Sequence, residues 1–129
     1  MARMRSLAFL ACLAPLAGGC TVAQPGRDEY AAAIAGRTAG PPESCVPMDS
    51  QQSLRVVDRQ TLAVEVGRTT WINRLEAPCP GLEPTSTVIT ETWGGRYCRG
   101  DHVRSVTPGM SIPGPVCVLG NFTPYRMAR

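Results

Sequence analysis

The chain has 129 residues, 13 arginines with no lysine against 10 acidic residues, and a formal net charge of +3. A chain of this length supports a single domain with a small core. Two of the arginines, Arg3 and Arg5, belong to the N-terminal segment, so the remainder is nearly neutral and lacks the basic surplus typical of nucleic-acid-binding proteins.

The first 20 residues have the layout of an export signal. A basic start leads into an apolar stretch over residues 6–17, followed by Gly-Gly-Cys at residues 18–20. The stretch is too short for a membrane-spanning helix, which needs about 20 apolar residues. The ending at Cys20 resembles the bacterial lipobox, which implies cleavage of a signal peptide, residues 1–19, and attachment of a diacylglycerol to the Cys20 thiol. A plain secretory signal is the alternative.

The lipobox resemblance implies a location and one partner. A chain acylated at Cys20 is held by its lipid on a membrane of the bacterial cell envelope. Thr21 follows the cysteine where an aspartate would favour retention at the inner membrane, so by resemblance to known sorting behaviour we expect the outer membrane, facing the periplasm.

Residues 20–44 are predicted to be a flexible tether that starts with the lipidated cysteine. The segment is rich in alanine, glycine and proline and has no alternating apolar pattern. Residues 28–35 could form one or two helical turns, with Asp28 as N-cap and Gly36 as the stop, but so short a helix is marginal in water.

From Cys45 onward, short β-rich segments alternate with turn residues. Residues 54–57, 61–66 and 69–75 predict three strands in a meander. In the middle strand Leu62, Val64 and Val66 share one face, so the face with Thr61, Ala63 and Glu65 should be wet.

The second half of this region continues the pattern. Residues 86–93 alternate, and Gly94-Gly95 predicts a tight hairpin into residues 96–98. Residues 103–106 and 116–122 supply the last strands. The expected fold is therefore all-β, a small six-stranded barrel or sandwich over residues 45–125, stapled by disulfides.

Four cysteines remain after the signal and Cys20 are set aside: Cys45, Cys79, Cys98 and Cys117. An even number in an exported chain of this size predicts two disulfides. Because chain ends of small β domains commonly meet, we expect Cys45–Cys117 together with Cys79–Cys98. Neither the spacing nor the single histidine, His102, suits a metal site, and no cofactor is expected.

The cysteine framework carries a family resemblance. Its markers are Cys79-Pro80-Gly81-Leu82, the stretch Tyr97–Val103, and Cys117-Val118-Leu119-Gly120 with Phe122–Tyr125 near the end. Together, over about residues 44–125, they resemble an uncharacterised family of small proteobacterial exported lipoproteins. The resemblance implies a compact, disulfide-stapled β domain and offers no catalytic or binding residues to transfer.

Few residues suggest chemistry. Asp101-His102 could orient an imidazole for acid–base work, but neighbours in a strand point to opposite faces, and no nucleophile motif accompanies them. Arg99-Gly100-Asp101 is best explained as a turn with Asp101 bonding local backbone. Trp71 and Trp93 are expected to fill the core, although an aromatic platform for a sugar or peptide is the alternative.

The remaining arginines alternate with acidic residues and predict a mixed surface, with a weak anion-binding face as the alternative. The predicted function is a non-enzymatic binding or accessory module for an envelope protein or glycan. The alternative is a small enzyme or enzyme inhibitor acting on cell-envelope polymers. A cleft with convergent polar groups would favour the enzyme, and an exposed apolar patch or open sheet edge the binding module.

Overall fold

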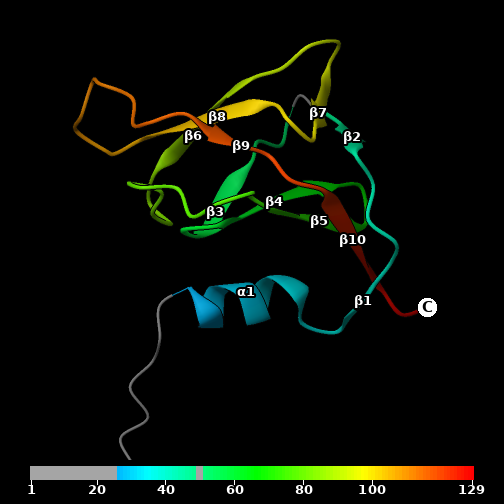
Figure 1. Cartoon of the computed structure of the whole chain (residues 1–129). Coiled ribbons are helices and arrows are strands. Elements are labelled where there is room, and N and C mark those ends of the chain that lie inside the picture. The colour runs from blue at the N-terminus through cyan, green and yellow to red at the C-terminus, as the bar shows by residue number, and fades with distance from the viewer. Residues whose placement is uncertain (1–25, 49–50) are drawn as a thin grey trace, which may run out of the picture.

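The computed structural model describes residues 26–48 and 51–129, so the predicted signal peptide and Cys20 lie outside the described residues. The described part is mostly β, with antiparallel sheets, two disulfides and one short helix (Figure 1). Its elements are α1 (Arg27–Ile34), β1 (Arg37–Ala39), β2 (Cys45–Pro47), β3 (Arg55–Asp58), β4 (Thr61–Val66), β5 (Thr69–Arg74), β6 (Thr87–Glu91), β7 (Arg96–Cys98), β8 (His102–Val106), β9 (Cys117–Val118) and β10 (Phe122–Met127). The expected small β domain is confirmed, with more and shorter strands than the six predicted.

The largest sheet has five antiparallel strands in the order β1-β10-β5-β4-β3. The predicted meander of β3, β4 and β5 is confirmed. Two short turns make it: Asp58 accepts a hydrogen bond from the Gln60 backbone N–H at 2.8 Å, and Gly67 adopts a φ of 62° between β4 and β5. That left-handed φ favours glycine because it has no Cβ.

The second β layer holds a three-stranded sheet, β6-β8-β9, and the pair β2-β7. The predicted hairpin across Gly94-Gly95 is therefore wrong, because β6 pairs with β8 while β7 pairs with β2. Burial explains the difference. Tyr97 of β7 lies opposite Val46 of β2, and both side chains are buried in the core.

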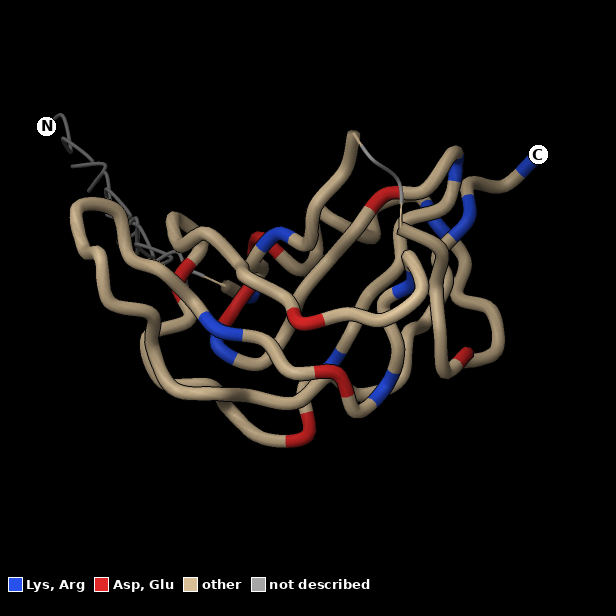
Figure 2. Tube along the Cα trace, turned by 90° about the horizontal axis from the view of Figure 1, so that it is seen from above, with Lys and Arg blue, Asp and Glu red and all other residues tan. Residues whose placement is uncertain are grey.

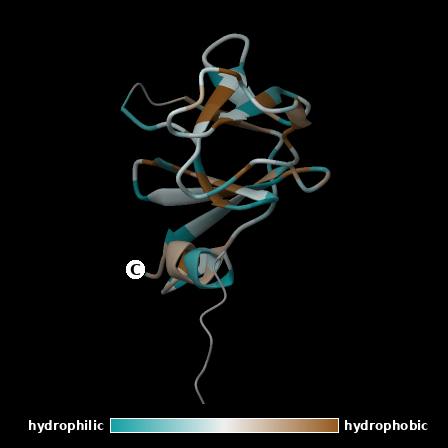
Figure 3. Ribbon diagram, turned by 90° about the vertical axis from the view of Figure 1, so that its left-hand side faces the viewer, coloured by the Kyte–Doolittle hydropathy of each residue, from teal (hydrophilic) through white to brown (hydrophobic). Residues whose placement is uncertain are grey.

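The core lies between the five-stranded sheet and the second β layer. The buried residues come from both layers and from the loops between them, and include Val46, Leu62, Val64, Trp71, Leu82, Tyr97, Val103, Leu119 and Phe122. Figure 3 shows hydrophobic stretches on the strands of both layers. Trp71 fills the core as predicted, whereas the same prediction for Trp93 is wrong, since Trp93 is 88% exposed.

Helix α1 covers the other face of the five-stranded sheet (Figure 1). Tyr30, Ala33 and Ile34 pack there against a small cluster made of Val57, Ala63, Ile72 and Tyr125. The predicted wet face of β4 is therefore wrong for Thr61 and Ala63, which are both buried, and holds only for the exposed Glu65.

The tether prediction is wrong for residues 26–44. After α1, β1 adds a strand beside β10, Gly40 N–H donates to the Pro124 carbonyl at 2.7 Å, and Glu43 forms a bridge with Phe122. The helix starts at Arg27 after Gly26 rather than after Asp28, and Gly36, with a φ of 67°, follows its end. These residues have too little apolar surface for a core of their own, but they cover apolar residues that the meander leaves uncovered.

The predicted disulfide pairing is wrong in both bonds. The structure joins Cys45 to Cys98 and Cys79 to Cys117. Cys45 lies opposite Cys98 in the β2–β7 pair, which places the two thiols together. The predicted final strand divides into β9 and β10, and only β10 runs back to the start of the domain. Cys117 in β9 therefore lies beside the loop that carries Cys79.

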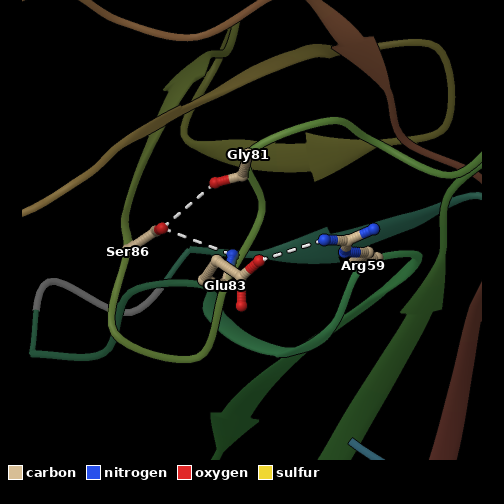
Figure 4. Close-up of polar contacts among 4 residues, drawn as sticks. All are labelled: Arg59, Gly81, Glu83 and Ser86. Atoms are coloured by element: carbon tan, nitrogen blue, oxygen red, sulfur yellow. Dashed lines mark hydrogen bonds and ion pairs between the residues drawn. The ribbon is translucent and has the colours of Figure 1, made fainter.

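That loop, between β5 and β6, is held by backbone and side-chain hydrogen bonds (Figure 4). Ser86 Oγ donates to the Gly81 carbonyl at 3.2 Å and accepts from the Glu83 N–H at 3.3 Å. An exposed ion pair of 3.5 Å joins Glu83 to Arg59, and the Cys79 N–H donates to the Arg59 carbonyl at 2.8 Å. These contacts attach the β5–β6 loop to the β3–β4 turn. The attachment connects the two layers.

A chain that begins at Glu43 is expected to melt more than about 10 °C below the mature chain. The truncation removes β1 and uncovers Val57, Ala63 and Ile72, whose exposure costs free energy of unfolding. Calorimetry measures the difference in melting temperature.

Two variants of α1 act as matched controls for this truncation. Ile34→Ser should lower the melting temperature in the same direction but less, because Ile34 packs on the sheet. Ala31→Ser, at an exposed position of the same helix, should change little. Equal melting temperatures for the truncated and mature chains would show that residues 26–42 contribute nothing to stability.

Candidate functional site

The Asp101 side chain bonds local backbone, and within the described residues no hydrogen bond joins it to His102. The Asp101 carboxylate accepts a hydrogen bond from the Cys98 N–H at 2.8 Å, and the Asp101 N–H donates to the Cys98 carbonyl at 3.1 Å. This confirms the predicted turn over Arg99-Gly100-Asp101, with Gly100 at a φ of 90°. The carboxylate is therefore occupied by local backbone.

His102 instead faces a carboxylate from the neighbouring strand. It lies opposite Glu91 in the β6–β8 register, with Nδ1 3.9 Å from Oε2. Both side chains are more than half exposed, at 55% and 66%, so water screens the pair. At this distance the two groups make a weak surface contact and no hydrogen bond.

The pair belongs to the outer face of the β6-β8-β9 sheet, which we call the outer surface. Register places seven side chains there: Thr87, Ile89, Glu91, His102, Arg104, Val106 and Val118. Their strand neighbours Val103 and Ser105 are buried, because they point to the core. In Figures 1 and 3, α1 lies on the opposite side of the molecule from this sheet.

The outer surface combines apolar and charged groups. Ile89 is 45% exposed and lies opposite Arg104, whose Nε is buried and has no hydrogen-bond partner among the described residues. β6 is an edge strand of its sheet. An edge strand presents unpaired backbone groups, which another chain can use for pairing.

A tight turn with an exposed tryptophan follows β6 directly. Trp93 lies in the turn that Gly94 and Gly95 close with φ values of 72° and 69°. Met48 ties the turn down, since its N–H donates to the Gly95 carbonyl at 3.0 Å and its sulfur accepts from Thr92 Oγ1 at 3.4 Å. The structure thus holds a large apolar ring in water, away from the buried Trp71, and the two tryptophans form no joint platform.

An apolar hollow of about 240 Å³ adjoins the outer surface at Val118. It lies beside the Cys79–Cys117 disulfide and is lined by Glu76, Ala77, Pro78, Pro80, Val116, Cys117 and Val118. Glu76 pairs with Arg99 at its border, at 3.9 Å. The hollow extends the apolar part of the outer surface toward the β5–β6 loop.

A smaller cavity of about 110 Å³ lies under α1. Its lining includes Tyr30, Thr61, Arg74 and Tyr125. The Tyr30 and Tyr125 hydroxyls are 3.0 Å apart, and this hydrogen bond, together with burial, raises the pKa of Tyr30 to about 12. Thr61 is 1% exposed, and its hydroxyl has no partner among the described residues. The volume suits a few water molecules rather than a ligand, since ligand pockets measure about 300–1,000 Å³.

The described residues contain no group of three histidine, cysteine or acidic side chains placed to hold a metal ion. Within the same residues no helix is long and apolar enough to cross a membrane. The lipidation prediction at Cys20 falls outside them.

The exposure of Ile89 and Trp93 could not be derived from the sequence. Residues 87, 89, 91 and 93 alternate with 88, 90 and 92, but each set mixes apolar and polar residues, so the pattern does not say which faces the core. The structure buries Val103 on β8, and register then places Ile89 outside.

The comparisons with known proteins give one family. No curated protein matches the chain, and no solved structure matches it. The profile described as "Family of unknown function (DUF6491)" matches residues 2–124, which reaches from the predicted signal segment into β10. The chain therefore belongs to the DUF6491 family of unknown function.

Proposed function

We propose that this protein is a lipid-anchored protein of the bacterial cell envelope, attached through Cys20, whose outer surface binds a partner protein without catalysis. Two disulfides support an oxidising compartment outside the cytoplasm. The outer membrane, facing the periplasm, is the proposed location.

The layer order is the observation that carries this proposal. Gly26 lies six residues after Cys20, a span of at most about 20 Å even when fully extended. A lipid on Cys20 therefore keeps the α1 side of the domain close to the bilayer. The outer surface, two layers away in Figure 1, then faces the aqueous space where a partner can reach it.

The composition of the outer surface favours a protein partner. Interfaces are enriched in tryptophan and arginine, and a few such residues carry most of the binding free energy. Trp93 is exposed beside Glu91 at the end of β6, and Ile89 and Arg104 lie on the same sheet. A glycan partner is the second outcome that the experiment distinguishes.

Crosslinking of the lipidated protein in its native membrane, followed by purification and mass spectrometry, tests the proposal. Trp93→Ala should reduce recovery of the crosslinked partner by about tenfold or more, as expected for an interface hot spot. The melting temperature should stay unchanged, because the Trp93 side chain is 88% exposed. Ile112→Ala is the matched control, an exposed apolar residue on the loop between β8 and β9.

Cys20→Ser tests the anchor separately. This variant should lose acyl labelling and leave the membrane fraction, because no lipid remains to hold it. Retention of label or of membrane attachment would contradict the proposed anchor. Equal crosslinking by the Trp93→Ala and parent proteins would contradict the proposed binding surface, and recovery of glycan alone would contradict a protein partner.

A further inference from the structure

We propose that four arginines at the α1 end of the molecule, Arg37, Arg68, Arg126 and Arg129, bind phosphate groups of anionic lipids in the membrane that holds Cys20. The protein then lies on the bilayer with this arginine cluster against the headgroups. The inference rests on the proposed lipid anchor and adds an orientation and a lipid chemistry to it.

The sheet brings these arginines together from three parts of the chain. Arg68 lies in the turn between β4 and β5, while Arg126 lies opposite Thr69 at the end of β10. Arg37 of β1 is opposite Met127, and its Nη1 donates to the Arg68 carbonyl at 3.3 Å. Arg68, Thr69, Arg126, Met127 and Arg129 line a hollow of about 190 Å³.

The arginines of the cluster form no ion pair among the described residues, and two neighbouring carboxylates, Glu29 and Glu65, line a separate hollow with Arg37 and Met127. Among the described residues no carboxylate lies within 4.0 Å of any of the four guanidinium groups, whereas Arg59 and Arg99 each have a glutamate partner. Figure 2 shows basic positions gathered near the C-terminus. Several unpaired guanidinium groups around a hollow suit an anion with several oxygens, because a guanidinium can donate two parallel hydrogen bonds to phosphate.

The cluster lies on the side of the molecule that the anchor brings to the membrane. In Figures 1 and 3 the C-terminus lies near the level of α1 and away from the β6-β8-β9 sheet. Within the described residues, the glutamates that form ion pairs, Glu76, Glu83 and Glu91, belong to the β5–β6 loop and β6, while Asp28 and Glu29 lie in the first turn of α1. Met127, at 55% exposure, adds an apolar side chain beside the arginines.

Lipid phosphate is favoured over free phosphate by proximity. The attraction of a single basic residue to an anionic membrane is weak, and a few such residues do not hold a dissolved phosphate ion firmly. A lipid on Cys20 holds the domain within about 20 Å of the headgroups, which raises the effective concentration of lipid phosphate at the arginine cluster. A weak electrostatic attraction is then enough to orient the protein.

Headgroup quenching of tryptophan fluorescence tests the orientation. The lipidated mature protein is reconstituted in vesicles of phosphatidylcholine that include a lipid with a nitroxide on its headgroup, with or without anionic phosphatidylglycerol. A Met127→Trp/Trp93→Phe variant reports on the arginine cluster, and the parent protein reports on Trp93. The buried Trp71 is common to both.

We expect strong quenching of the Met127→Trp/Trp93→Phe variant in anionic vesicles and little quenching of the parent. The signal should fall in neutral vesicles and at high salt, which screens the charges. Adding Arg68→Gln, Arg126→Gln and Arg129→Gln should abolish most of it. A control with Arg59→Gln, Arg96→Gln and Arg99→Gln removes the same charge elsewhere and should preserve it.

Two results would overturn the inference while leaving the anchor intact. The first is vesicle-bound protein with equal quenching in the two arginine triple variants. The second is release of quenching by inorganic phosphate but not by chloride at the same ionic strength, which would make a dissolved anion the occupant. Failure of the anchor looks different, because the parent protein would then not float with vesicles of either composition.

Discussion

Replacing Cys79 and Cys117 together by alanine is expected to lower the free energy of unfolding by about 4 kcal/mol, from the entropy regained by the unfolded chain. The bond closes a loop of 38 residues and joins the β5–β6 loop to β9. A domain of this size has a total stability of about 5–15 kcal/mol, so the loss is a large fraction of it. Thermal melting should show a decrease of roughly 20 °C.

The matched control replaces Cys45 and Cys98, whose separation is 53 residues, and should cost a similar amount, about 4 kcal/mol. Loss of both bonds should leave the chain unfolded at growth temperature. Peptide mapping without reduction should recover Cys79 joined to Cys117. Recovery of Cys79 joined to Cys98 would contradict the structure, and an unchanged melting curve would contradict a stabilising role.

Gly120→Ala is expected to destabilise the protein by about 3 kcal/mol or more, since a tightly packed interior cannot absorb an added methyl group. A Cβ at this position would overlap the carbonyl oxygen of Arg74 on β5. Asn73 fixes the same backbone, because its amide donates to the Gly120 carbonyl at 2.8 Å and accepts from the Gly120 N–H at 3.1 Å. Denaturant unfolding measures the loss.

Gly109→Ala distinguishes steric overlap from a general cost of replacing glycine. Gly109 has a φ of 83° and open space around its Cβ position, so its replacement should cost only the conformational strain, about 1 kcal/mol. Asn73→Ala should cost about 1–3 kcal/mol, because it leaves buried groups of Gly120 without partners. Equal losses for the two glycine variants would show that contact with Arg74 is unimportant.

Several local features were determined by the sequence alone. The β3–β4–β5 meander was predictable because period-two alternation and turns at Gly67 and Asp58 act over a few residues. The turn at Arg99-Gly100-Asp101 was predictable for the same reason. The presence of two disulfides followed from cysteine number and chain size.

The sequence contains only a weak indication that α1 packs on the sheet, because its segment is rich in alanine and glycine. Tyr30, Ala33 and Ile34 have the spacing of one helix face, but eight residues are too few to form a stable helix alone. Only the folded meander supplies Val57, Ala63 and Ile72 as the surface to cover. The contribution of the segment therefore depends on a sheet that forms from residues far along the chain.

Disulfide pairing and the exposed face of β6 were decided by the tertiary structure. Cys98 lies opposite Cys45 because β7 pairs with β2, which buries Tyr97 beside Val46, instead of forming the predicted hairpin with β6. The alternation of apolar and polar residues does not predict which of two nearby strands β7 pairs with. Ile89 is exposed because β8 fixes which side of β6 faces the core, and Trp93 is exposed in the turn that follows β6. The arginine cluster arises because β1, β10 and the β4–β5 turn, remote in sequence, end at one corner of a sheet. The spacing of residues along a chain does not predict these long-range contacts. They depend on which strands share hydrogen bonds and which side chains fill the core.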